Sequence, residues 1–125
     1  MSILRTILFS LLCLASAGSA RAHDDPLQTF SSCVGRLSAT MEHQWLLSDP
    51  MSDRTEAQRA AMLSLVEAIM PAGDGRHVLA WRIAAKRAHA VLLTRATFND
   101  DAADAAWALT RAEAELAACT RLLLS

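Results

Sequence analysis

The positions of three cysteines constrain the fold of this 125-residue chain more than any other feature of its sequence. Cys13 lies inside an apolar run near the start, whereas Cys33 and Cys119 stand near the two ends of the remaining chain. If the leading run is removed on export, two cysteines remain in an oxidising compartment, and they can pair within one chain in only one way. We therefore expect a disulfide bond between Cys33 and Cys119 that joins the first and last parts of the fold.

Residues 1–22 match the pattern of a secretory signal peptide. Residues 1–5 carry one positive charge, residues 7–14 are almost entirely apolar, and Ala-Arg-Ala at 20–22 places small side chains where signal peptidase cuts. The apolar run is far shorter than the roughly 20 residues that a transmembrane helix needs. We expect a mature domain of residues 23–125 in the periplasm or outside the cell, without an integral membrane segment.

The charge balance of that mature domain is mildly acidic. The whole chain has 12 Lys and Arg against 13 Asp and Glu, and loss of Arg5 and Arg21 leaves 10 basic residues and a net charge of −3 with histidine neutral. Because nucleic-acid-binding proteins depend on basic surfaces, we expect no nucleic-acid partner. The 53% content of hydrophobic residues is too high for a disordered chain, and the length fits one domain.

Four helical blocks follow the leader. Apolar residues recur three and four residues apart in blocks at about 27–47, 53–70 and 76–97, and in a last block that ends near Leu123. Short connections favour antiparallel neighbours, so we predict an all-α, up-down-up-down four-helix bundle, stapled by one disulfide after a cleaved signal peptide. This topology places the start of the first helix beside the end of the last, which brings Cys33 close to Cys119.

The same periodicity predicts the core. We expect the third block to be the most buried, since it is long and apolar, and we expect Asp53 and Glu56 to form a capping box at the start of the second. On the first block, one face collects Phe30, Cys33, Val34, Leu37, Met41 and Trp45. On the last block, a seam of the left-handed bundle type has the spacing 4-3-4-3-4 and consists of Ala105, Leu109, Ala112, Leu116, Cys119 and Leu123.

Sequence patterns for catalysis and cofactors are lacking. The chain has no Cys-x-x-Cys-His for haem, no Glu-x-x-His for a di-iron site, no Gly-rich phosphate loop and no nucleophile elbow, so we expect neither an enzyme nor a cofactor. His23, His43, His77 and His89 stand in separate segments, and we expect each at the surface and no metal site. The alternative is a copper ion chelated by the free amine and the imidazole of His23.

Basic residues gather on one side of the third block. Arg82, Lys86 and His89 lie within about 60° of one another on a helix. The favoured interpretation is a solvated face that pairs with acidic residues of a neighbouring helix, and the alternative is contact with an anionic ligand or partner.

Trp107 points away from the predicted seam of the last block. On a helical projection it shares an outer face with small residues, Ala103, Ala114 and Ala118, and Arg111 and Arg121 lie at the margins of this stripe. A large aromatic residue beside small residues and arginine is typical of an interface anchor. We therefore predict a partner-binding surface of Trp107, Ala103, Ala114, Ala118 and Arg111. The alternative is that residues 23–29 or a loop between helices cover this stripe, or that the last helix packs within the bundle on two sides.

These patterns predict a small exported helical accessory or binding protein that acts through a helix surface. Its partner would be another envelope protein or a second copy of the chain. The alternative is a carrier of a small ligand or copper, or a stress sensor of the cell envelope, which would use His23 or a cavity near Trp45 and Trp81.

Overall fold

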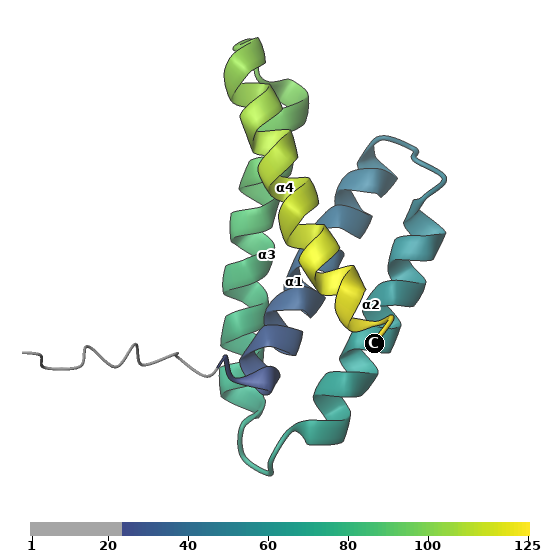
Figure 1. Cartoon of the computed structure of the whole chain (residues 1–125), viewed down its shortest axis with the longest axis vertical. Helices are drawn as coiled ribbons and strands as arrows, with labels where there is room; N and C mark the ends of the chain where they lie inside the picture. Colours follow the sequence, from purple (N-terminus) through teal and green to yellow (C-terminus); the bar gives the residue numbers. More distant parts are fainter. Residues whose placement is uncertain (1–23) are drawn as a thin grey trace, which may run out of the picture.

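Four helices account for nearly all of residues 24–125, which are the residues that this computed structural model describes. They are α1 (Pro26–Leu46), α2 (Ser52–Ile69), α3 (Gly75–Phe98) and α4 (Ala102–Leu122) (Figure 1). Between residues 24 and 125 there is no β-strand. The all-α prediction is confirmed. The proposed signal peptide and His23 lie outside the described residues.

Aspartates begin two of the helices. The Asp25 carboxylate accepts a hydrogen bond from the amide of the second helical residue of α1, and the Asp101 carboxylate caps α4 in the same way. The predicted capping box of α2 is wrong, because α2 begins at Ser52 and has no side-chain cap. The side chain of Asp49 instead accepts a hydrogen bond from the backbone amide of Met51 at 2.8 Å. This bond stabilises the turn that precedes α2, so the helix begins before Asp53.

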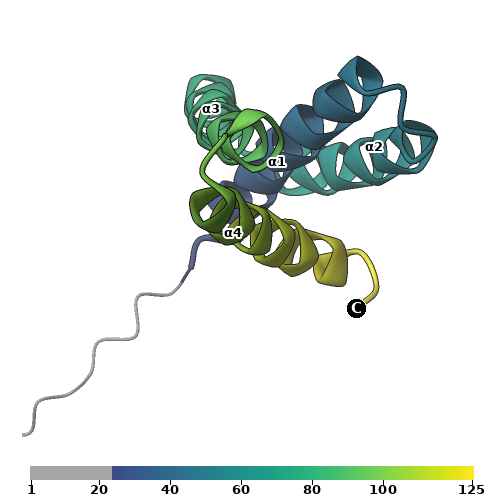
Figure 2. The ribbon, with the colours of Figure 1, turned by 90° about the horizontal axis from the view of Figure 1, so that it is seen from above.

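Helix α1 lies at the centre of the fold. It packs along α2 and α3 and meets α4 over a shorter stretch, as both views show (Figure 1 and Figure 2). Its predicted inward residues Cys33, Val34 and Leu37 are buried, whereas Trp45 near its end is 52% exposed. The buried core cluster takes members from α1, α2, α3 and α4: Leu27, Cys33, Val34, Leu37, Met62, Val66, Val78 and Cys119.

The prediction that the third helix is the most buried is wrong. In α3 only Val78 and His89 are buried, and Val91 is 56% exposed. Helix α1 packs against α2, α3 and α4, whereas α3 packs mainly against α1 and α4. The apolar composition of α3 therefore did not predict its burial, because the burial of a helix depends on how many other helices pack against it.

Gly35 allows α1 and α3 to approach closely. A Cβ atom at this position would lie 2.9 Å from the backbone nitrogen of Lys86 and closer still to the carbonyl oxygen of Arg82. A glycine inside a helix costs roughly 0.5 to 1 kcal/mol relative to alanine. Here the missing side chain lets the two backbones touch, so the packing of α3 on α1 offsets that cost.

The predicted disulfide joins α1 to the end of α4. Cys33 and Cys119 are bonded with their Cα atoms 5.4 Å apart, and both are buried. Helix α4 otherwise packs mainly on α3 and only briefly on α1. The bond therefore fixes the end of α4 that lies far from its connection to α3.

The predicted seam of α4 is shifted in the structure. Ala112 and Cys119 are buried as expected, but Leu109 is 47% exposed and Ala108, which the seam leaves out, is fully buried. A strict 4-3 spacing assumes that helices lie side by side along their length. Helix α4 crosses α1 obliquely (Figure 1). Its buried face is therefore centred on Ala108, Ala112 and Cys119 and not on the predicted seam.

Loss of the disulfide should destabilise the fold strongly. Closing a chain segment of 86 residues lowers the entropy of the unfolded state, and the chain-entropy model gives about 4 to 5 kcal/mol for a loop of this size. We expect reduction, or the double variant Cys33→Ser/Cys119→Ser, to lower the free energy of unfolding by this amount in guanidinium titrations followed by circular dichroism. Reductant should not affect the double variant, and an unchanged midpoint on reduction of the wild type would contradict the prediction.

Gly35→Ala should separate α1 from α3. We expect it to lower the free energy of unfolding by about 1 to 3 kcal/mol, despite the higher helix propensity of alanine, because the added methyl meets backbone atoms. Gly75→Ala is the matched control, since its Cβ atom would meet nothing within 4 Å. Equal melting temperatures for the two variants would show that the close approach is not needed.

Candidate functional site

The predicted partner-binding residues lie together on one flank of α4. Trp107, Ala103, Ala114, Ala118 and Arg111 are all exposed, with Trp107 at 56%. On a helix with about 100° per residue they span roughly 80°, and they lie to one side of the buried residues of α4. We call these five residues the α4 outer surface.

A cation–π contact restricts the Trp107 indole. The guanidinium of Arg95 from α3 lies 5.1 Å from the ring centroid, in cation–π geometry. Arg95 and Asn99 both donate hydrogen bonds to the Asp104 carboxylate. The hydrogen bond from Arg95 is the main reason that the pKa of Asp104 lies below its usual value. The sequence of α4 gave no sign of Arg95, because this residue belongs to the preceding helix.

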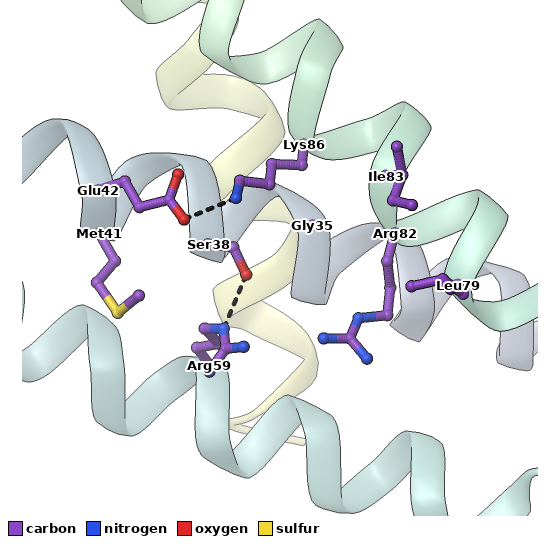
Figure 3. A pocket seen from close by; sticks show the side chains of 9 residues that line it. All are labelled: Gly35, Ser38, Met41, Glu42, Arg59, Leu79, Arg82, Ile83 and Lys86. Atoms are coloured by element: carbon purple, nitrogen blue, oxygen red, sulfur yellow. Dashed lines mark hydrogen bonds and ion pairs between the residues drawn. The ribbon is translucent and has the colours of Figure 1, made fainter. Parts of the chain in front are cut away.

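A second candidate site is a cavity of about 200 Å³ between α1, α2 and α3 (Figure 3). It carries three basic side chains and one acidic side chain, and we call it the basic pocket. Its lining residues are Gly35, Ser38, Met41, Glu42, Arg59, Leu79, Arg82, Ile83 and Lys86.

Hydrogen bonds hold part of this lining in place. Arg59 Nε donates to Ser38 Oγ at 2.7 Å, and Ser38 Oγ donates to the carbonyl oxygen of Val34 one turn earlier, also at 2.7 Å. Lys86 Nζ donates to Glu42 Oε1 at 2.6 Å, which is the expected pairing with an acid of a neighbouring helix. Ser38 and Arg59 were missed from sequence, since only the tertiary packing brings them to α3.

His89 was expected at the surface, and this prediction is wrong. Its side chain is 1% exposed, with Nδ1 3.5 Å from Glu115 Oε2 of α4. Glu115 also accepts a hydrogen bond from Arg111 at 2.8 Å and lies 3.6 Å from Arg36 Nε of α1. Sequence reasoning missed this cluster, because its members come from three helices that the disulfide region brings together.

Burial and charge shift the pKa values of this pair. Removal from water is the main reason that the pKa of His89 is lowered, and it outweighs the opposing effect of Glu115. Burial alone would raise the pKa of Glu115, but hydrogen bonds from Arg111 and His89 and the charge of Arg36 reverse the direction and lower it. His89 is therefore held neutral next to an ionised carboxylate.

The residues named for the alternative carrier function do not meet. Trp45 lies near the end of α1, whereas Trp81 lies in the second turn of α3 and stacks on His77 with ring centroids 5.9 Å apart. A more apolar cavity of about 280 Å³ lies between α1, α3 and α4, and neither tryptophan lines it. Leu109 lines this cavity, which accounts for part of its exposure.

No metal site is assembled within residues 24–125, where no three His, Cys, Asp or Glu side chains are grouped suitably for an ion. None of the four helices is sufficiently long and apolar to cross a membrane. Comparisons with protein-family models, curated proteins and solved structures find no match to this chain.

Acid should destabilise the protein through His89. The native state holds this side chain with a lowered pKa, so stability is fully present above the unfolded value of about 6.5 and is lost as the pH falls through the native pKa. We expect the free energy of unfolding to fall below pH 6.5 by at most about 1.4 kcal/mol per pH unit, the slope for one proton.

Urea titrations between pH 7.5 and 5.5 test this prediction. His89→Gln should remove most of the slope, whereas His77→Gln, at an exposed position, should leave it unchanged. The same slope in wild type and His89→Gln would contradict the assignment.

Proposed function

We propose that this protein is a small exported helical binding protein that acts in the cell envelope through the α4 outer surface, without catalysis of its own. In this proposal residues 1–22 are a cleaved signal peptide, and residues 23–125 form an up-down-up-down bundle in the periplasm or outside the cell. The observation that carries the proposal is the exposed Trp107, fixed by Arg95, on a flank of otherwise small residues.

The fixed indole supports a binding role. Tryptophan and arginine are enriched among the residues that dominate interface affinity. A side chain that must be ordered on binding weakens the complex, and Arg95 and Asp104 already restrict the ring. Trp107 can therefore bury a large apolar area in a partner at a low entropic cost.

The small residues favour a helical partner. The distance between the axes of two packed helices depends on the side chains at their contact. Alanine permits the shortest of these distances, about 8 Å. Ala103, Ala114 and Ala118 lie on both sides of Trp107 along α4, so a partner helix could lie along this flank with the indole in its groove. We propose another envelope protein as the partner, with a second copy of this chain as the competing outcome.

Trp107→Ala should weaken partner binding strongly without unfolding the protein. We expect affinity for the partner to fall by at least about 30-fold, as for an interface residue worth 2 kcal/mol or more, because the anchor is removed. The measurement is native mass spectrometry of the exported protein, followed by affinity titration with the protein that copurifies. Circular dichroism should remain nearly unchanged, since the side chain is exposed.

Trp45→Ala is the matched control, because Trp45 is equally large, 52% exposed and on a different helix. It should leave the affinity within about twofold of wild type. An affinity for the partner that Trp107→Ala leaves within about twofold of wild type would refute the proposed surface. A mass that doubles with concentration, and returns to the monomer in Trp107→Ala, would assign the surface to self-association.

A further inference from the structure

Two guanidinium groups of the basic pocket face the same cavity without a carboxylate partner. Figure 3 shows Arg59 reaching in from α2 and Arg82 from α3. Among the described residues, neither forms an ion pair, whereas Arg36, Arg95 and Arg111 each lie within 4.0 Å of a carboxylate oxygen. The acid that lines the pocket, Glu42, is already bonded to Lys86. The pocket therefore has an excess of positive charge.

Both arginines are partly shielded from water. Arg59 and Arg82 are partly buried, and Arg59 is oriented by its hydrogen bond to Ser38. Like charges gathered in one cavity repel, and partial burial weakens the screening by water. An oxyanion between them would reverse this repulsion, since guanidinium groups bind carboxylate and phosphate through paired N–H donors.

Part of the rim of the pocket is apolar. Leu79 and Ile83 lie one turn apart on α3 and are 52% and 42% exposed, and the buried Met41 adds apolar surface from α1. Cationic groups next to exposed aliphatic side chains match a ligand that has an anionic group and a short apolar part. A purely polar anion would leave the aliphatic rim in water.

The volume limits the size of the ligand. A cavity of about 200 Å³ lies below the range of about 300 to 1,000 Å³ typical of pockets for drug-sized ligands. It is much larger than the roughly 10 to 15 Å³ that one water molecule requires. A single anionic group with a few carbon atoms suits this space.

We propose that the basic pocket binds a small amphipathic oxyanion, with its carboxylate or phosphate group between Arg59 and Arg82 and its apolar part on Leu79 and Ile83. Gly35 contributes by setting the spacing, because the close approach of α1 to α3 determines where Arg82 stands. The site does not include α4, so it is independent of the proposed partner surface.

Isothermal titration of the wild-type protein at pH 7 and low salt tests the ligand class. The probes are hexanoate, hexyl phosphate, inorganic phosphate and hexanol. We expect hexanoate or hexyl phosphate to bind, inorganic phosphate to bind at least about tenfold more weakly than hexyl phosphate, and hexanol not to bind. The tighter binder of hexanoate and hexyl phosphate shows whether the pocket prefers a carboxylate or a phosphate. Hexanol binding as tightly as both anions, or no binding of either anion at millimolar concentration, would overturn the proposal.

Variants test the residues. Arg82→Gln should weaken binding of the hexyl anion about tenfold or more, whereas Arg87→Gln, an exposed residue of α3 outside the lining, should change it less than twofold. Equal losses in the two variants would show a general charge effect and overturn the site. Arg59→Lys keeps the charge but removes the paired donors, and should also weaken binding if it remains folded by circular dichroism. Trp107→Ala should bind the anion normally, so failure here is distinguishable from failure of the proposed partner surface.

Discussion

The bond between Cys33 and Cys119 is the constraint on which the placement of α4 depends. Helix α4 leaves α3 through a short turn and packs on it, but its contact with α1 is brief. The sulfur bridge holds the far end of α4 on α1 and brings Arg36, His89 and Glu115 into one cluster. The orientation of α4, and with it the orientation of the α4 outer surface, is thus set by the disulfide at the end of α4 and by the short turn between α3 and α4 at its start.

Local features of the fold were predictable from the sequence. Helix bounds follow from apolar spacing and from residues such as Pro26 and Asp101, whose effects act within one turn. The disulfide was predictable on the expectation that Cys13 is lost with the leader, because the two remaining cysteines allow one pairing. The relative burial of the helices was not, since Val91 and Leu109 have apolar side chains but are 56% and 47% exposed.

The candidate sites show the same division. Residues of the α4 outer surface belong to one helix, so a projection was sufficient to place Trp107 beside its alanines. The basic pocket draws Ser38, Arg59 and Arg82 from three helices, and its existence depends on how closely those helices approach. Likewise, burial of His89 depends on the crossing angle of α4, which periodicity along one helix does not encode.

Helix α1 separates the two surfaces, as Figure 3 shows with α4 behind α1 and the basic pocket in front. Almost every residue from Ser31 to Met41 is buried, because opposite sides of this segment serve different neighbours. Selection for folding alone would therefore slow divergence along this stretch. The other helices are more exposed, so their sequences can change more freely. We expect distant homologues to resemble this chain most closely along residues 31–41.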